Sequence, residues 1–257
     1  MDVHIKRRGS GDHGSLLCEA AGLRWLAAAD AAPVVRVLAV DDDALELERL
    51  RSVRPTPEAA ETFGRHLSDL HAAGAPAFGS PPDGWTGDIW IGVQSQPARP
   101  TPTWGPFFAE QRIAVFLPRA VDNGNLTVTE SDLVLRVCER IAAGEFDRMG
   151  LPEPPRPARI HGDLWTGNLI FTDRGGVLID PAAHGGHRLT DPAMLALFGA
   201  PHLETILNAY AESAGLVDGW HEALVLHQMH PLATHSVRHG RGYGTALVSA
   251  ARRVAAW

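Results

Sequence analysis

Three side chains that carry oxygen atoms lie close together in the second half of the chain. Asp163 precedes Asn168 by five residues, and Asp180 follows Asn168 by twelve. The apolar runs 169–171 and 177–179 are typical of a strand pair, which would bring all three side chains to one rim. Phosphoryl transfer needs a carboxylate that accepts the proton of an attacking hydroxyl, and oxygen ligands that hold Mg²⁺. We predict Asp163 for the first role and Asn168 and Asp180 for the second. The alternative is a turn that is merely rich in Asp and Asn.

The residue before Asp163 bears on the type of acceptor. Regulated protein kinases place an arginine at the matching position, where it holds a phosphorylated activation loop. This chain has Gly162 there, and only about ten residues separate Asp180 from the next expected helix. A small-molecule acceptor is therefore favoured over a protein substrate of the regulated-kinase kind.

A single lysine gives the second signal. Of the 23 basic residues only Lys6 is a lysine. It ends the strand-like run 3–5 and occupies the place of the strand lysine that reaches nucleotide phosphates and pairs with a helix glutamate. A bulky, planar arginine does not replace a compact ammonium there. Glu19, on the first expected helix, is the predicted partner. The alternative is that Lys6 simply survived a composition bias towards arginine.

The elements around these residues predict two parts. Residues 1–50 are expected to form a small mixed lobe, and residues 51–257 a larger, mostly helical lobe, which together make an α+β fold. The loop 74–106 is too long for a connector and is expected to cover a site. Strands are expected over 3–5, 34–40, 44–50, 169–171 and 177–180, and helices over 15–26, 58–73, 107–119 and 130–149. From residue 192 the chain reads as helical, with breaks at 199, 215 and 240–244.

Composition excludes several classes of protein. Hydrophobic residues make up 45% and charged residues 21%, as in an average globular chain with a real core. A formal net charge of -7 without a dense basic run disfavours nucleic acid as a partner. The two cysteines, Cys18 and Cys138, form no C-x-x-C pair and are predicted to be core residues in a reducing compartment. No signal peptide or membrane-spanning run is evident, so we expect a cytoplasmic protein that needs no membrane.

Several runs resemble the fructosamine kinase (ketosamine kinase) family. They are RIHGDLWTGN at 159–168, IDPA at 179–182 and GGHRLTD at 185–191, and the similarity extends from about Val3 to the end of the chain. The resemblance implies a two-lobed fold like that of protein kinases and aminoglycoside phosphotransferases. It also implies ATP-dependent phosphorylation of the sugar part of glycated amines, usually at the third carbon of a ketosamine.

The family pattern assigns roles position by position. It implies that Asp163 is the catalytic base and that Lys6 with Glu19 positions the phosphates. It also implies that the segment Glu48, Arg49 and Leu50 is the hinge whose backbone meets adenine. Asn168 and Asp180 would be the Mg²⁺ ligands, so the cofactors are ATP and Mg²⁺. The expected partner is a small or protein-bound glycated amine, and the protein is expected to be a monomer.

The acceptor side is less sharply marked. Trp165 lies two residues past the base, where an indole face suits the apolar face of a sugar; the alternative is a core tryptophan that anchors the loop. His184 and His187 follow Asp180 and are candidate acceptor contacts, although their flanking glycines equally indicate a tight turn. Asp191 is expected to tie the catalytic loop to the following helix. The other late histidines, at 227, 230, 235 and 239, are expected in helix packing or cleft lining rather than in a zinc site.

One departure from the family concerns the start of the chain. The family places a strand pair and a phosphate-covering loop before the lysine strand, whereas five residues precede Lys6 here. The expectation is a small lobe without its first strand pair, with reduced turnover. A degenerate kinase fold that binds a ligand or partner without turnover is the alternative of another class. A kinase with a different hydroxyl acceptor is a third; the segment 74–106 holds few acidic residues, which disfavours polycationic aminoglycosides.

Overall fold

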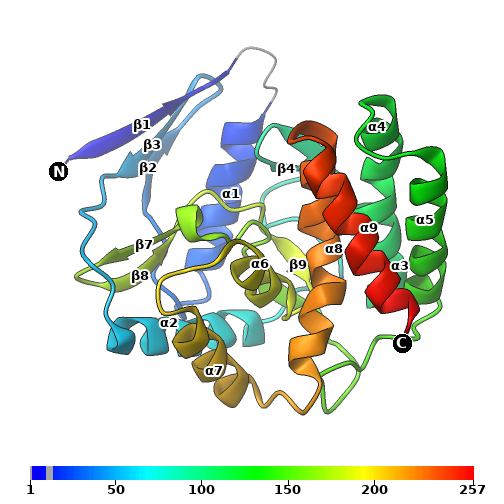
Figure 1. The fold of residues 1–257 in the computed structure, drawn as a ribbon. Helices are drawn as coiled ribbons and strands as arrows, with labels where there is room; N and C mark the ends of the chain where they lie inside the picture. Colours follow the sequence, from blue (N-terminus) through cyan, green and yellow to red (C-terminus); the bar gives the residue numbers. More distant parts are fainter. Residues whose placement is uncertain (1, 10–13) are drawn as a thin grey trace.

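The structure, a computed structural model, describes residues 2–9 and 14–257. Its first part is a three-stranded antiparallel sheet in the order β1-β3-β2, with one helix packed against it. The strands are β1 (Val3–Arg7), β2 (Val37–Val40) and β3 (Ala44–Glu48), and the helix is α1 (Ser15–Ala27). Figure 1 shows these elements as one group at the left of the molecule.

Local sequence explains this sheet. Leu45 and Leu47 alternate with polar residues along β3, and their buried side chains face α1. Between β2 and β3 the Asp41 carboxylate accepts hydrogen bonds from the backbone amides of Asp43 and Ala44, at 2.9 and 2.8 Å. The acidic stretch is therefore a turn held by an Asp side chain. The predicted strand, helix and hairpin of this region are confirmed.

Two short antiparallel strand pairs follow the three-stranded sheet. The hairpin β7 (Leu169–Thr172) and β8 (Gly175–Leu178) stands as predicted. The second pair, β6 (Ala158–Ile160) with β9 (His184–Gly186), brackets the predicted catalytic segment on both sides. The backbone amide of Val35 donates to the carbonyl of Leu178 at 3.0 Å, which joins the first part of the chain to β8.

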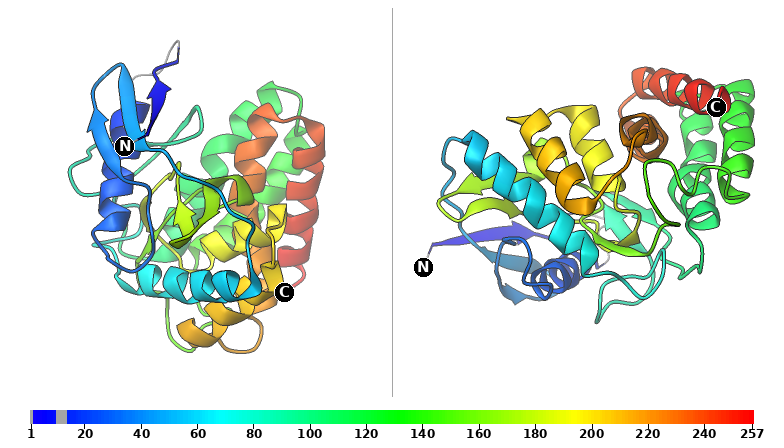
Figure 2. Two further views of the ribbon diagram at one scale, coloured as in Figure 1. Left: turned by 90° about the vertical axis from the view of Figure 1, so that its left-hand side faces the viewer. Right: turned by 90° about the horizontal axis from the view of Figure 1, so that it is seen from below.

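The rest of the molecule is helical. Helix α2 (Pro57–Ala72) begins at Thr56, whose side chain accepts from the Ala59 amide, and it packs along α7. Figure 2 shows these two helices side by side below the sheets. The remaining helices are α3 (Trp104–Phe108), α4 (Leu117–Asp122), α5 (Val128–Ala142), α6 (Thr190–Phe198), α7 (Leu203–Ala214), α8 (Trp220–Arg238) and α9 (Arg241–Ala255). A buried aromatic and aliphatic core holds α3, α5, α8 and α9 together.

Three predicted elements differ from the structure. The expected helix 107–119 begins at Trp104 and passes through a π-helical turn (Ala109–Ile113) and a short 3₁₀ turn (Ala114–Phe116) before α4. The expected helix 130–149 ends at Ala142, because turns follow in which Gly144 takes a φ of 81°. The predicted loop 74–106 contains the hairpin β4 (Ile89–Ile91) and β5 (Gln94–Gln96).

The fold has two parts of the protein-kinase-like type, a small mixed sheet region followed by a larger helical region. The irregular stretch 49–56 joins them. The division at residue 50 remains a prediction. Within the described ranges, no helix combines the length and apolar character needed to cross a bilayer.

Candidate active site

The predicted base lies in the loop that follows β6. Gly162 adopts a left-handed φ of 80°, and a Cβ there would lie 2.3 Å from the Ala182 carbonyl oxygen. Only glycine fits this turn without moving the backbone. This steric requirement explains the glycine at position 162 whatever the type of acceptor.

A buried carboxylate holds this loop in place. Asp191, at the start of α6, accepts hydrogen bonds from the backbone amides of His161 and Gly162, at 2.8 and 2.9 Å. Its Oδ2 also lies 3.0 Å from Nε2 of His71 on α2, and His71 Nδ1 lies 2.8 Å from the Tyr210 hydroxyl on α7. Burial alone would raise the pKa of Asp191, but the hydrogen bond and charge of His71 hold that pKa below its ordinary value. The structure thus gives Asp191 the tethering role that we expected.

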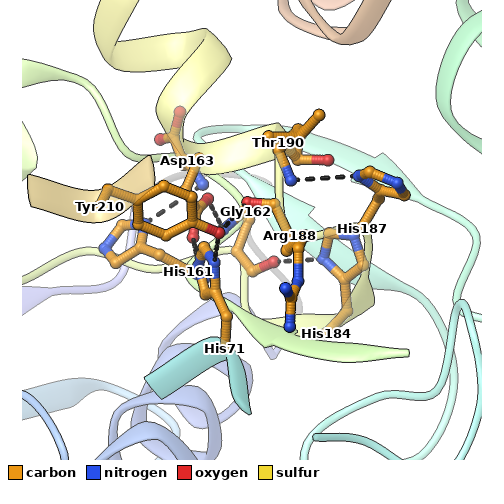
Figure 3. A network of polar contacts seen from close by, with 12 residues as sticks. His71, His161, Gly162, Asp163, His184, His187, Arg188, Thr190 and Tyr210 are labelled. Carbon is orange, nitrogen blue, oxygen red and sulfur yellow. Dashed lines mark hydrogen bonds and ion pairs between the residues drawn. The ribbon is translucent and has the colours of Figure 1, made fainter. Parts of the chain in front are cut away.

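The three predicted catalytic side chains come together. The Asn168 side-chain amide donates to the Asp163 carbonyl at 2.8 Å, to Asp163 Oδ2 at 3.2 Å and to the Asp180 carbonyl at 3.3 Å. Its nitrogen is therefore committed to the loop, which leaves the amide oxygen for a cation. Figure 3 shows the Asp163 carboxylate pointing away from the buried network of His71 and Tyr210.

The environment of Asp163 shifts its titration. Burial raises the pKa of Asp163 to about 7, and the negative charges of Asp180 and Asp191 add to the rise, while the hydrogen bond from Asn168 opposes it. A carboxyl group with a pKa near neutrality is suited to accept a proton at physiological pH.

The predicted lysine pair is present as well. Lys6 Nζ lies 2.7 Å from Glu19 Oε2 on α1 and 3.0 Å from Asp180 Oδ1. Burial opposes the charge of Lys6, yet the nearby carboxylates of Glu19 and Asp180 raise its pKa overall. Burial raises the pKa of Glu19, although Lys6 counteracts this. The ammonium ion thus bridges the first part of the molecule and the Asp180 loop.

Three cavities meet at these residues. One of about 440 Å³ is lined by Lys6, Glu19, Asn168, Asp163 and Asp180, among others. A second of about 230 Å³ lies next to it, shares Asp180 with it, and is lined by Glu48, Arg49 and Leu50 together with the apolar Val35, Leu47, Ile170 and Ile179. The predicted hinge therefore borders a small pocket whose walls are largely apolar.

The carboxylate of Glu48 borders this pocket but is paired with two arginines. Its Oε1 lies 2.7 Å from Arg174 Nη2 and its Oε2 lies 3.0 Å from Arg36 Nε. The backbone amide of Arg49 donates to the Asp2 carbonyl at 2.9 Å. The side chain of Glu48 thus ties β3 to the β7–β8 hairpin, and any contact with a base would come from the backbone.

The third cavity, of about 560 Å³, lies on the other side of the predicted base. It shares Asp163 and Trp165 with the first cavity, and its far walls come from the end of α8 and the start of α9. The lining side chains that the sequence did not single out as site residues include Phe198, Thr234, Arg238 and Tyr243. We call this space the acceptor cavity, after the role that we propose for it below. Residues 91–94, from the predicted loop 74–106, close one side, as expected of a segment that covers a site.

Trp165 borders both cavities and is 42% exposed. Its indole lies against Gly167, where a Cβ would come within 2.3 Å of the ring. The ring is therefore seated on the catalytic loop with one part open to solvent, and it is not a core tryptophan.

His184 and His187, predicted as acceptor contacts, are buried and line none of these cavities. The Arg112 Nε donates to His184 Nε2 at 3.2 Å, and His184 Nδ1 donates to the Ala182 carbonyl at 2.7 Å. The Leu189 amide donates to His187 Nδ1 at 3.1 Å. Burial lowers the pKa of both imidazoles well below the usual value. Gly185 and Gly186 belong to strand β9, which pairs with β6, so these histidines lie in the core and not at the acceptor cavity, contrary to the prediction.

The four histidines at 227, 230, 235 and 239 fall into two pairs with different surroundings. His227 stacks on His187 with ring centroids 4.3 Å apart, and His230 Nε2 lies 3.1 Å from Gln96 Oε1, so both pack inside. His235 and His239 line the acceptor cavity. Residues three or four apart share a face of a helix, so His227 and His230 lie on one face of α8, and His235 and His239 lie together on another side at its end.

Comparison with known proteins agrees with this geometry. The model of the fructosamine kinase family matches residues 5–256. A protein of Enterococcus faecium that carries the name probable ketoamine kinase is 32% identical over 70% of this chain and 61% of its own length. A Synechocystis protein of the same name is 31% identical over 88% of this chain and 73% of its own length. The first two curated relatives are thus matched over only 61% and 60% of their length.

Solved structures show the same relationship. A Thermobifida fusca structure that carries the name "putative fructosamine-3-kinase" has a TM-score of 0.89 and 43% identity, and the match covers 99% of this chain and 86% of that one. An aminoglycoside phosphotransferase solved with gentamicin has a TM-score of 0.57 and 11% identity over 98% of this chain and 84% of that one. The latter shares the fold alone.

Proposed function

Because the chain belongs to the fructosamine kinase family, we propose that it transfers the γ-phosphoryl group of ATP to a sugar hydroxyl of a ketosamine. The proposed acceptor is a fructosamine- or ribulosamine-type glycated amine, either small or attached to a protein. Phosphorylation of such a compound destabilises its link to the amine, so the reaction serves to remove the sugar.

The residues on the page divide the work of this reaction. The apolar pocket beside Leu50 would hold adenine, and Lys6, fixed by Glu19, would place its ammonium against the phosphates. Asp163 would orient the acceptor hydroxyl and accept its proton as the oxygen attacks phosphorus. The raised pKa of Asp163 matches this role near neutral pH.

Asn168 and Asp180 fit a magnesium ion by their chemistry. Both present oxygen atoms at the rim of the cavity that contains Lys6, and the Asn168 nitrogen is already engaged by the Asp163 and Asp180 carbonyls. Bound there, Mg²⁺ would neutralise phosphate charge as the transfer proceeds.

One observation carries the proposal above the others: Asp163 lines both the cavity that holds Lys6, Asn168 and Asp180 and the separate acceptor cavity. A base shared by two cavities can contact a hydroxyl from one side while the γ-phosphoryl group approaches from the other. A fold that only binds a ligand has no need of this arrangement.

The test is release of ADP with Mg²⁺·ATP and N-(1-deoxyfructosyl)glycinamide, compared with free fructose and with a peptide that contains serine. We expect turnover on the ketosamine above the other two, and phosphorus NMR should place the new ester on the sugar. Tight nucleotide binding without transfer to any acceptor would contradict the proposal and favour a binding protein of the same fold. Transfer to free fructose at the same rate would indicate another acceptor class.

We further propose that the protein works as a monomer in the cytoplasm, without nucleic acid or membrane partners. Two buried, unbonded cysteines and the net charge of -7 support this setting. Light scattering should give the mass of one chain; a stable dimer would correct the proposal.

A further inference from the structure

The acceptor cavity contains a positive charge that the proposed reaction does not use. Arg238 lies exposed in the last turn of α8, three residues after His235 on the same side of the helix. Among the lining residues that the structure describes, Arg238 is the only lysine or arginine and Asp163 the only carboxylate. The cavity thus has a base at one end and a cation at another place on its wall.

The Arg238 guanidinium has no ion pair or hydrogen bond within residues 2–9 and 14–257. Its neighbour in sequence, Arg241, provides the contrast. Arg241 contacts both carboxylate oxygens of Glu130, at 2.6 and 2.8 Å. An unpaired guanidinium in a cavity can offer the same two-pronged contact to a carboxylate or phosphate of a ligand.

The aromatic walls of the cavity strengthen the electrostatic attraction between Arg238 and an anionic ligand. Trp165, Phe198 and Tyr243 present aromatic rings, which lower the local polarity. Burial lowers the pKa of His235, so its imidazole is neutral at physiological pH. The charge that an incoming acceptor meets away from Asp163 is therefore set by Arg238.

We propose that Arg238 selects anionic acceptors, namely ketosamines that carry a carboxylate or phosphate group away from the hydroxyl that is attacked. This inference rests on the proposed function and names a narrower substrate class for the same cavity. The competing explanation is that Arg238 only stabilises the end of α8 through the helix dipole, which would affect stability without affecting the choice of acceptor.

Three acceptors that differ in whether and where they carry an anionic group test the inference. They are N-(1-deoxyfructosyl)glycine, with a carboxylate on the amine side, its neutral glycinamide counterpart, and the 6-phosphate of that glycinamide compound. We expect kcat/KM for one of the anionic compounds to exceed that of the neutral compound at least tenfold, which corresponds to about 1.4 kcal/mol. The anionic compound that is preferred identifies the end of the acceptor that Arg238 contacts.

Variants assign the preference to this residue. Arg238→Gln should bring the anionic-to-neutral ratio close to one, Arg238→Lys should keep part of it, and Arg252→Gln, on the exposed side of α9, should keep all of it. A wild-type ratio below about two for both anionic compounds, or an unchanged ratio in Arg238→Gln, would overturn the inference. Calorimetric binding of the three compounds separates the two hypotheses: binding that follows charge without turnover would contradict the proposed function but support the role of Arg238.

Discussion

The two sides of Asp163 differ in how they are built. On the side that we propose for the nucleotide, Lys6 forms two ion pairs, at 2.7 Å with Glu19 and at 3.0 Å with Asp180. On the acceptor side the walls are mostly rings, and the one arginine has no protein partner among the described residues. The charges on the first side are paired with each other, whereas the guanidinium of Arg238 on the second side is left to pair with a ligand. The contrast shows that the charges of Lys6, Glu19 and Asp180 are paired within the protein, whereas the proposed acceptor cavity is lined by side chains from α8 and α9 that lie far from the catalytic loop in sequence.

The largest expected effect comes from the residue that the two sides share. Asp163→Asn keeps the shape of the side chain but removes the proton acceptor, so kcat should fall about 10²- to 10⁴-fold while ATP affinity stays within a factor of a few. Steady-state kinetics with calorimetric ATP binding checks this. Asp173→Asn, in the exposed β7–β8 turn, is the matched control and should behave as the wild type. More than a third of the wild-type kcat in Asp163→Asn would show that Asp163 is not the base.

The next effect tests the nucleotide side alone. Asp180→Ala removes a proposed oxygen ligand of Mg²⁺ and one of the two carboxylate partners of Lys6, so Mg²⁺·ATP should bind at least about tenfold more weakly. The KM for the acceptor should change little, because Asp180 does not line the acceptor cavity. Equal Mg²⁺·ATP affinity in both proteins, measured by calorimetry, would remove Asp180 from the metal site. If Asp180→Ala instead raised only the KM for the acceptor, Asp180 would belong to the acceptor side.

The pH dependence tests the base without a change of sequence. Asp163 acts only when unprotonated, and its pKa is raised to about 7 by burial. Below that pH the protonated fraction grows, so kcat/KM should fall about tenfold for each pH unit and level off above pH 7. The residual rate of Asp163→Asn should lack this step. A wild-type profile that stays flat down to pH 5 would contradict the raised pKa.

The smallest effect concerns the acceptor side. Trp165→Ala removes a ring that is still 42% exposed, so we expect the acceptor KM to rise by a factor of about 3 to 10 with the ATP KM unchanged. Trp165→Phe should recover most of the loss, since it keeps an aromatic face. If both variants instead lower kcat with unchanged acceptor KM, the indole serves the loop conformation rather than the sugar.

The nucleotide side could be predicted because its signals are local. Asp163, Asn168 and Asp180 lie within one hairpin unit, and the contact predicted between Lys6 and Glu19 is confirmed at 2.7 Å. The catalytic roles of these residues remain predictions. The spacing of residues along one short segment suffices there, since few conformations of a strand pair are available.

The acceptor side could not be predicted in the same way. Arg238 and Tyr243 reach the cavity because α8 and α9 pack on a core whose geometry depends on the whole chain. His184 and His187 were misplaced because nearness in sequence to Asp180 does not determine which way strand β9 and the residue after it direct their side chains. The hairpin β4–β5 was missed because β4 is only three residues long and β5 is the polar run Gln94–Gln96, which shows no apolar alternation.

The close approach at Gly162 has a consequence for how such a protein can change over generations. Any larger residue at 162 would have to take a left-handed backbone and share space with the Ala182 carbonyl, which a Cβ would meet at 2.3 Å. An arginine there, which is what phosphorylation-controlled relatives of this fold use, is therefore closed to single substitutions. The backbone around 180–184 must shift before that mutation is tolerated, so a change towards an arginine at this position has to begin outside the catalytic loop.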